Sequence, residues 1–211
     1  GPTPNYWRAR TDNDADSLDQ KWQTANEGMV VDAFTVETAA DGKSATVSVT
    51  LRLTGANDSL QKMTYTVYST GEITVAADLE PGEGMGQMLR YGAELTLPVD
   101  YDQITWYGNG PQETYQDRKQ GASVGVWEST VLDSYYPFVR PQDCGNHTDV
   151  RYFAVESDAT GLGLMVVGTD VVEAGALYWN VKELSTTHTD MEKRHPYQLE
   201  KPSHTVLHVD L

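Results

Sequence analysis

A period-two alternation of apolar and polar residues runs through much of the chain. In SATVSVTLRL (44–53) every second residue is apolar, and the runs KMTYTVYST (62–70) and EITVAADL (72–79) continue the pattern. Such alternation is typical of strands that bury one face. The separators GANDS (55–59) and STGE (69–72) carry the Gly, Asn, Asp and Ser of tight turns. These segments predict antiparallel hairpins with one face in solvent.

Further strands are predicted along the rest of the chain. Alternating segments occur at 90–98, 102–108, 122–128, 150–157 and 204–211. Two other segments, GLGLMVVGT (161–169) and ALYWNVKEL (176–184), are more continuously apolar, which predicts deeply buried strands.

Helical patterns are scarce. Only DSLDQKW (16–22) and THTDMEKRHP (187–196) indicate helix, and EPGEGMGQM (80–88) is interpreted as a hairpin loop because no helix pattern follows its glycines. Many short strands with little helix favour an all-β sandwich or barrel. No linker divides the chain, so we expect a single domain over residues 1–211.

Composition excludes two classes of partner. The formal charge is −16, from 31 acidic and 15 basic residues, and such a field repels phosphate backbones and anionic lipids. No apolar run approaches the roughly 20 residues needed to span a bilayer. We therefore expect no nucleic acid and no membrane among the partners. A neutral ligand such as a sugar is compatible with the charge.

The single cysteine, Cys144, cannot form an internal disulfide or a thiolate zinc site. His147 and Asp149 lie close in sequence and could assist a reactive thiol. No helix N-terminus or basic cluster is evident there to lower the pKa of the thiol. Cys144 is therefore interpreted as structural.

The five histidines raise the question of a metal site. His204 and His208 are four residues apart, but HTVLHVDL alternates like a strand, which separates the two by roughly 13 Å. His188 and His195 lack the HExxH arrangement of zinc proteases. We expect no metal site.

The loop WYGNGPQETYQDRKQ (106–120) concentrates polar chemistry. Glu113 and Asp117 flank Tyr115, and Arg118 follows them. Two carboxyl groups about 5–5.5 Å apart could serve a retaining glycosidase. An arginine beside carboxylates favours their ionised form, which suits a structural clamp better than a general acid. The residues favour the clamp and leave catalysis as the alternative.

Three long strings carry a family resemblance. They are NYWRARTDND (5–14), WYGNGPQETYQDRKQGASVGVWE (106–128) and YPFVRPQDCGNHTDVRYFAV (136–155). In order and spacing they closely resemble the C-terminal domain of large bacterial β-galactosidases of glycoside hydrolase family 2. Arg10 stands where the family has proline, and Asp143-Cys144 replace Glu-Asn. These departures put in doubt the family's usual contacts of the loop at 140–151.

The resemblance implies an antiparallel β-supersandwich of the galactose-mutarotase-like type. It implies that the parent enzyme hydrolyses terminal β-D-galactosides with retention, using glutamates of a TIM barrel that is absent here. In that family this domain packs on the barrel and forms a wall of the sugar pocket. We therefore expect no catalytic residue and no cofactor in this chain, with any Mg or Na of the parent held by other domains. Its partners would be those domains and, through the parent, the β-galactoside.

The last strand pattern runs on to Leu211 without a polar tail. The family's G-x-G-G-D-x-S-W string, which contributes a tryptophan to the pocket, would follow there and is missing. We therefore expect a domain truncated at its C-terminal end.

Polar residues of two strings are the candidates for facing the sugar pocket or another domain. They are Arg8, Asp12, Asn13, Asp14, Asn146, His147 and Asp149. The alternative is that they bond neighbouring loops or the absent barrel.

Two other functions remain open at this point. An aldose-epimerase-like enzyme on the same fold would use His147 or His208 with Glu113 as acid and base, although no epimerase string is present. A stand-alone carbohydrate-binding module would use tryptophans as stacking platforms. The alternative for the five tryptophans (7, 22, 106, 127, 179) is burial in the core.

Overall fold

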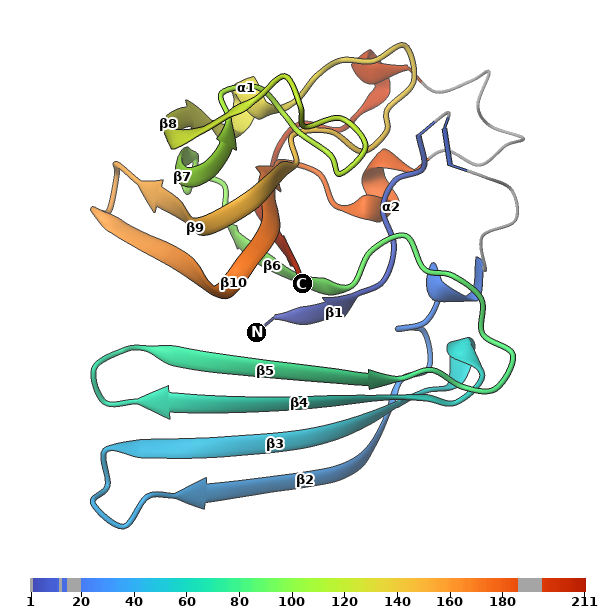
Figure 1. The fold of residues 1–211 in the computed structure, drawn as a ribbon, viewed down its shortest axis with the longest axis vertical. Helices are drawn as coiled ribbons and strands as arrows, with labels where there is room; N and C mark the ends of the chain where they lie inside the picture. The colour runs from blue at the N-terminus through green and yellow to red at the C-terminus, as the bar shows by residue number, and fades with distance from the viewer. Residues whose placement is uncertain (1, 12, 15–19, 186–194) are drawn as a thin grey trace. The chain divides into compact units, whose positions relative to one another are not determined.

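The computed structural model describes residues 2–11, 13–14, 20–185 and 195–211. Its contacts divide the chain into two compact units, one of residues 1–15 with 89–211 and the other of residues 16–88. Each unit contains one sheet, and every strand pair in both sheets is antiparallel (Figure 1). The prediction of an all-β chain built from antiparallel sheets is confirmed. Its organisation as one domain stays a prediction, and the units are described separately.

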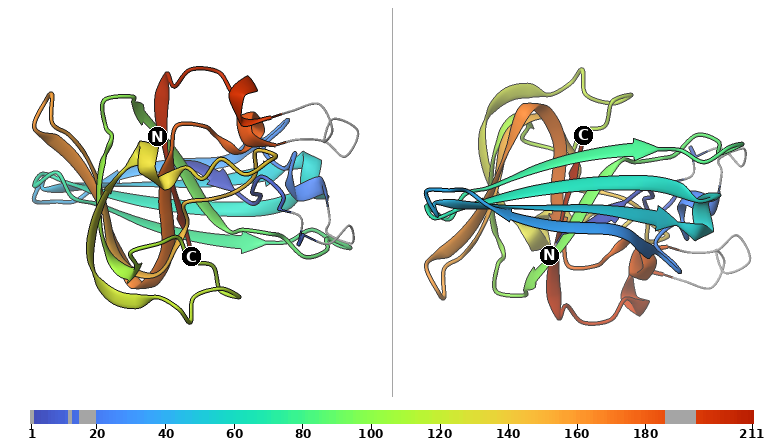
Figure 2. Two further views of the ribbon diagram at one scale, coloured as in Figure 1. Left: turned by 90° about the horizontal axis from the view of Figure 1, so that it is seen from above. Right: turned by 90° about the horizontal axis from the view of Figure 1, so that it is seen from below.

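The smaller unit is a four-stranded meander. Its strands are β2 (Val30–Thr38), β3 (Ser44–Leu53), β4 (Ser59–Tyr68) and β5 (Ile73–Glu80), paired in chain order. They lie side by side in all the ribbon views (Figures 1 and 2). The hairpins predicted from the alternation and the two turns are confirmed.

Strand β2 was not predicted. Its register slips between Val31 and Ala33, where a bulge disturbs the period of two that identifies a strand. After the bulge, Phe34 pairs with Val49 and Val36 pairs with Val47, so these apolar side chains share one face of the sheet.

The larger unit is a seven-stranded sheet in the order β1-β6-β11-β10-β9-β7-β8. Its strands are β1 (Thr3–Asn5), β6 (Gly92–Pro98), β7 (Gln103–Gly110), β8 (Ser123–Thr130), β9 (His147–Ser157), β10 (Leu162–Leu177) and β11 (His204–Asp210). The prediction of a hairpin loop at 80–88 is wrong, because this segment leads from β5 to β6, which belong to different sheets.

The helices are single turns. They are η1 (Gln20–Trp22), η2 (Thr54–Ala56), α1 (Val131–Ser134), α2 (Val181–Leu184) and η3 (Pro196–Gln198). Among the described residues no helix is long and apolar enough to cross a bilayer. Of the two predicted helices, residues 16–19 and 186–194 lie outside the described residues.

The strand predicted at 176–184 is wrong beyond Leu177. Asn180 accepts a hydrogen bond from the backbone N–H of Glu183, whose carboxylate accepts one from the backbone N–H of Asn180. This capping box starts α2 and competes with continuation of β10.

One face of the seven-stranded sheet is apolar. Its core includes Ile104, Trp106, Phe153 and Leu207, each no more than 1% exposed. The prediction that the whole of 161–169 is deeply buried is wrong. Leu164 and Val166 pack on the core, whereas Met165 and Val167, which point to the other face, are 60% and 66% exposed. Leu162, at the start of β10, is 62% exposed.

We expect the Ile104→Ala variant to lose about 2–5 kcal/mol of unfolding free energy, because a fully buried side chain leaves a cavity. Urea unfolding followed by tryptophan fluorescence measures the loss. The control Val167→Ala, at a 66% exposed position of the same sheet, changes the value by less than about 0.5 kcal/mol. Equal losses for the two variants would contradict this account of the core.

Candidate functional site

Strand β11 carries two buried ionisable residues on one face. His208 is 5% exposed and Asp210 is 6% exposed, whereas Leu207 and Val209 belong to the apolar core on the other face. Residues two apart on a strand share a face. Burying such groups is costly unless they have partners. The neighbouring strands and loops supply those partners.

Two glycines make room for these side chains. The Cβ of any residue at Gly175 would lie 2.6 Å from the His208 ring, and a Cβ at Gly92 would lie 2.5 Å from Oδ1 of Asp210. In the register of the sheet, Gly175 is opposite His208 and Gly92 is opposite Asp210. The two polar side chains therefore lie over positions that have no side chain.

Arg90 is the buried cation beside this face. Its Nε atom lies 2.8 Å from Oδ2 of Asp210, and Nη2 lies 3.4 Å from Oδ2 of Asp143. The hydroxyl of Tyr115 donates to the same oxygen of Asp143 at 2.9 Å. Burial would lower the pKa of Arg90, but the carboxylates of Asp143 and Asp210 outweigh it and raise the pKa. The guanidinium stays charged.

Two carboxyl groups near Arg90, those of Asp210 and Glu94, have raised pKa values. Burial raises the pKa of Asp210 to about 7; the charges of Asp143 and Glu173 add to the rise, and Arg90 opposes it. Burial also raises the pKa of Glu94, which faces His208 across the sheet. The carboxyl groups around Arg90 therefore outnumber the single positive charge of its guanidinium.

Asn146 connects the histidine of β11 to a carboxylate of β10. Its Oδ1 lies 3.2 Å from Nε2 of His208, and its Nδ2 donates to Oε2 of Glu173 at 2.6 Å. Gln116 donates to the other oxygen of Glu173 at 2.7 Å. Burial lowers the pKa of His208 well below its usual range, so the ring is neutral at physiological pH. We call Arg90, Asp143, Asn146, Glu173, His208 and Asp210 the polar network.

His147, the first residue of β9, packs on the apolar face, whereas the side chain of Asn146 just before it bonds His208 and Glu173 of the polar network. The ring of His147 stacks on Trp106 with centroids 3.9 Å apart, and only 3% of the residue is exposed. Burial lowers the pKa of His147 to about 4. The structure therefore does not bring these two predicted site residues together.

The N-terminal candidates form their own ion pair. Arg8 Nη2 lies 2.6 Å from Oδ1 of Asp14, and Oδ2 of Asp14 accepts the backbone N–H of Thr11 at 2.8 Å. The guanidinium of Arg8 also lies over the ring of Tyr115, 5.6 Å from its centroid, next to the polar network. Asn13 is exposed. Asp12 lies outside the described residues.

Asp149 of β9 joins strand β7 to the loop that follows it. Its Oδ2 accepts from Asn109 at 2.7 Å, and its Oδ1 lies 3.0 Å from Nζ of Lys119. The backbone of Asp149 has φ +53°, in the left-handed region that few non-glycine residues adopt. The side chain therefore bonds a neighbouring strand and a loop of the same unit, and its role toward a sugar pocket or another domain stays a prediction.

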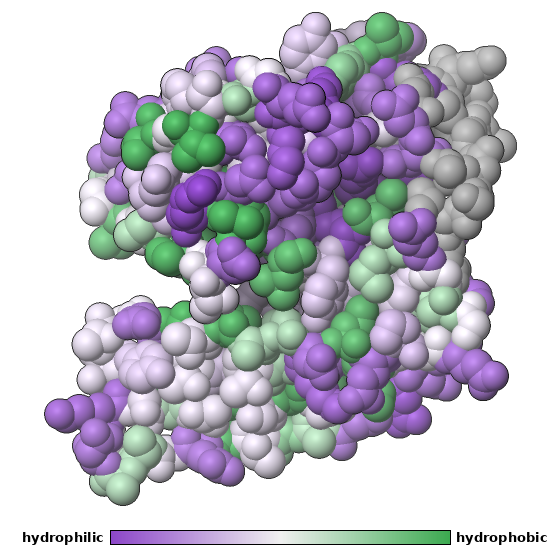
Figure 3. Space-filling model, in the orientation of Figure 1, coloured by the Kyte–Doolittle hydropathy of each residue, from purple (hydrophilic) through white to green (hydrophobic). Residues whose placement is uncertain are grey.

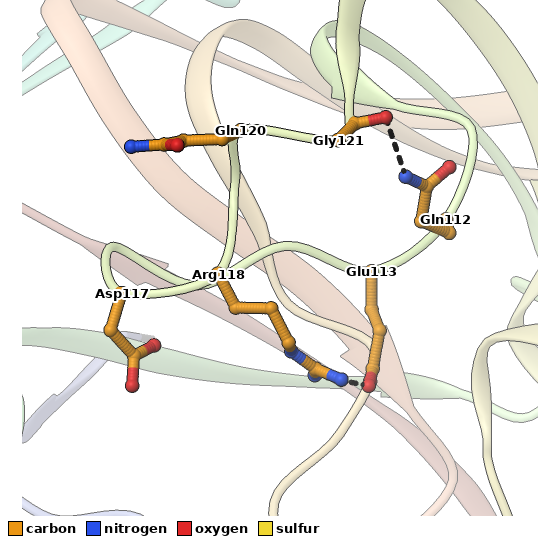
Figure 4. Close-up of a pocket in the computed structure, with 6 residues that line it drawn as sticks. All are labelled: Gln112, Glu113, Asp117, Arg118, Gln120 and Gly121. Carbon is orange, nitrogen blue, oxygen red and sulfur yellow. Dashed lines mark hydrogen bonds and ion pairs between the residues drawn. The ribbon is translucent and has the colours of Figure 1, made fainter.

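The loop after β7 carries the residues of the expected clamp (Figure 4). Arg118 Nη2 lies 2.6 Å from Oε1 of Glu113, whose Oε2 accepts the backbone N–H of Gly145 at 2.8 Å. Asp117 is exposed and points away from the guanidinium. Because Arg118 is 60% exposed, the ion pair is worth about 1 kcal/mol or less. The bond from Glu113 to Gly145 is the better protected contact.

The same loop borders an open hollow of about 640 Å³. Its lining includes Gln112, Gln120 and Gly121 beside the ion pair. Hydrophilic residues gather over this loop on the face shown in Figure 3. Both oxygens of Glu113 already have partners within the chain. This arrangement suits a structural contact better than proton transfer.

The structure also bears on two further candidates from the sequence, a reactive thiol and a metal site. Burial raises the pKa of the Cys144 thiol to about 12, which keeps the thiol protonated and unreactive. Within the described ranges, no three side chains of His, Cys, Asp or Glu are grouped so that they could hold a metal ion.

Sequence reasoning missed most of the polar network. It did not select Arg90, Glu173 or Asp210, and it considered His208 only as a metal ligand or an epimerase residue. One signal was available: in HTVLHVDL, His208 and Asp210 fall on the same face of a strand that is otherwise apolar or buried. Arg90 and Glu173 carry no comparable signal.

A family model described as beta galactosidase small chain matches residues 1–211. The chain therefore belongs to this family.

Its relatives carry matching names. The chain is 37% identical over 188 residues to a beta-galactosidase of Priestia megaterium, covering 87% of this chain and 18% of that protein. It is 32% identical over 218 residues to a beta-galactosidase of Halalkalibacterium halodurans, covering 99% and 20%. It is 28% identical over 214 residues to one of Streptococcus thermophilus, again covering 99% and 20%. The chain thus spans 18–20% of the length of these relatives.

Replacing Arg90 by Met should cost about 3–5 kcal/mol of unfolding free energy, because Asp143 and Asp210 would stay buried without a counter-charge. The triple variant that also carries Asp143→Asn and Asp210→Asn should recover most of the loss. Urea unfolding above neutral pH measures both. The control Arg52→Met removes the more exposed ion pair with Asp32 and costs less than about 1 kcal/mol. Equal losses for the two single variants would contradict the network.

His147 makes stability depend on pH. In the unfolded chain the imidazole binds a proton below its usual pKa of 6.5, whereas in the folded chain it does so only below about 4. Stability from this group is therefore complete above pH 6.5 and falls by about 3 kcal/mol as the pH drops to 4. Unfolding free energies of wild type and His147→Phe, measured across this range, should diverge by that amount. Parallel curves would show that the pKa of His147 is not lowered.

Proposed function

We propose that this chain is a non-catalytic C-terminal domain of a family 2 β-galactosidase. In this proposal it packs on a catalytic barrel in the rest of the parent and helps to wall the galactoside pocket. The parent would hydrolyse terminal β-D-galactosides with retention. The observation that carries the proposal is that relatives named beta-galactosidase match this chain over 87–99% of its length, yet are about five times longer.

The chemistry of the polar side chains supports a role without catalysis. A retaining glycosidase needs one carboxyl group poised as acid and another free to attack the sugar. Glu113 is bonded to Arg118 and to the backbone of Gly145, and Asp143 is bonded to Arg90 and Tyr115. Both carboxylates are therefore held in place by partners within the chain, and neither is free to attack a sugar. Such groups stabilise loops.

The candidates for the pocket wall differ in how well they could reach a partner. Asn146 is fully buried and His147 is 3% exposed, so these two support the inside of the unit. Arg8, Asp14 and Asp149 are partly exposed and already paired within the chain. They could still add hydrogen bonds to a partner, since a carboxylate or guanidinium accepts or donates several.

The two rival functions gain no support from the burial of their residues. An epimerase would need a histidine that exchanges protons with a sugar, but His147 and His208 are no more than 5% exposed. A binding module would need exposed aromatic platforms. Trp7, Trp22 and Trp106 are 1–3% exposed, which matches the alternative of core residues. Trp127 and Trp179 are partly exposed, and both pack against the core.

Hydrolysis of a nitrophenyl β-galactoside tests the proposal. We expect no turnover by this chain alone, and turnover when it is combined with the remainder of the parent polypeptide. A Glu113→Gln variant of the chain should support the same turnover per folded complex, because Glu113 has no part in the chemistry. Turnover by the chain alone that Glu113→Gln abolishes would overturn the proposal, as would full activity of the remainder without the chain.

A further inference from the structure

One face of the four-stranded sheet in the smaller unit is apolar across all its strands. Val36 of β2 is opposite Val47 of β3. Val47 is in turn opposite Tyr65 of β4, and Tyr65 is opposite Val75 of β5. Directly opposite residues of antiparallel strands point to the same face. The two neighbouring rows begin at Phe34 and Thr38 of β2 and are apolar except for Thr38 itself. We call these three rows the apolar sheet face.

The charged side chains of β3 to β5 lie on the other face of this sheet. Arg52 and Lys62 alternate along their strands with the apolar residues. They form ion pairs with Asp32 and Glu80 of neighbouring strands. An antiparallel sheet with this division commonly packs its apolar face against another layer and leaves the polar face in solvent. The residue pattern is therefore that of a sheet covered on its apolar side.

Much of the apolar sheet face is nevertheless exposed. Met63 is 4% exposed, whereas five other large apolar side chains of this face are 42–62% exposed. These five are Phe34, Val36, Val67, Ile73 and Val75. They come from three of the four strands and are joined by the half-buried residues of β3 and β4 between them. A contiguous apolar patch of this kind on a soluble protein marks an interaction surface.

The composition of this face defines the chemistry of its partner. The three rows contain no charged residue, and their hydrogen-bonding side chains are those of Thr38 and Tyr65. Such a face binds by burying apolar surface, so its partner must present an apolar face as well. An anionic lipid surface and a second copy of this chain both carry negative charge, and the formal charge of −16 repels them.

The relatives indicate a source for such a partner. The matched stretch is 18–20% of each of the β-galactosidases described above, so about four fifths of such a protein lies outside it. Sheets bury their apolar faces against neighbouring layers of secondary structure. We propose that the apolar sheet face docks against an apolar face of the parent β-galactosidase that lies outside this chain. This inference rests on the proposed function, and it names the surface through which the chain joins the parent.

Cysteine labelling tests the proposal. In the Val36→Cys variant a maleimide should label the new thiol readily in the chain alone, because position 36 is 55% exposed. Addition of the remainder of the parent polypeptide should slow this labelling at least about tenfold, since a covered thiol reacts only when the complex opens. The native Cys144 adds little background, because it is buried and burial raises its pKa to about 12.

The matched control is Thr35→Cys, at the neighbouring position on the other face of β2. Its labelling should be the same with and without the remainder of the parent. In a complex that hydrolyses a nitrophenyl β-galactoside, unchanged labelling of Val36→Cys would overturn the docking surface. Slow labelling of Val36→Cys in the chain alone would also overturn it, because the face would then be covered within the chain or by a second copy.

Two charged variants of β5 measure how much the face contributes to affinity. Val75→Asp places a carboxylate on the apolar sheet face and should weaken binding to the remainder at least about tenfold, because docking would bury an unpaired charge. Thr74→Asp adds the same charge on the other face and should leave the affinity unchanged. Equal affinities of the two variants would contradict the proposal. If Val75→Asp does not fold, the labelling of Val36→Cys decides alone.

The docking surface and the proposed function fail in different ways. Turnover by the complex without protection of Val36→Cys would contradict the surface and leave the function standing. Protection of Val36→Cys in a complex without turnover would support the surface and contradict the function.

Discussion

A single buried guanidinium constrains the larger unit. Arg90 precedes β6, Asp143 lies in the loop before β9, and Asp210 ends β11, so one side chain joins three distant parts of the chain. A charged residue that is only 8% exposed is tolerable only if its partners stay in place. The partners are in turn held by Tyr115 and by the register of β11. These contacts therefore hold the segment before β6 and the loop before β9 to the end of β11.

The sheet separates two kinds of packing. Its apolar face collects the large core side chains, while its other face collects the polar network and the loops that bond to it. Hydrophobic burial supplies most of the stability of such a fold, and a polar network that is well paired makes one arrangement of loops preferable to others. The adjacent residues Asn146 and His147 lie on opposite sides of this division between polar and apolar packing. His147 stacks on Trp106 in the core, whereas its neighbour Asn146 orients His208 on the polar face.

The elements that could be predicted from the sequence are those determined by residues close together in the chain. Strands β3 to β5 and β11 follow from alternation, and the pairing of Glu113 with Arg118 joins residues five apart. Strand β2 was not predicted because a bulge interrupts its period of two. Helix α2 was not predicted because a capping box starts a helix within an apolar segment that indicated a strand. The polar network was not predicted for a different reason. Arg90 and Asp143 are 53 residues apart, and only the order of strands in the sheet brings such residues together. No local pattern encodes that order.

The two glycines beneath His208 and Asp210 link positions that are remote in sequence. At Gly92, even a methyl group would collide with the carboxylate of residue 210 and with the backbone oxygen of Val209. At Gly175, it would meet the ring of residue 208 and the backbone oxygen of Gly145. Because each contact includes a backbone oxygen, a smaller side chain at position 210 or 208 would not make room for a side chain at Gly92 or Gly175. The backbone of the neighbouring chain segments therefore requires glycine at both positions.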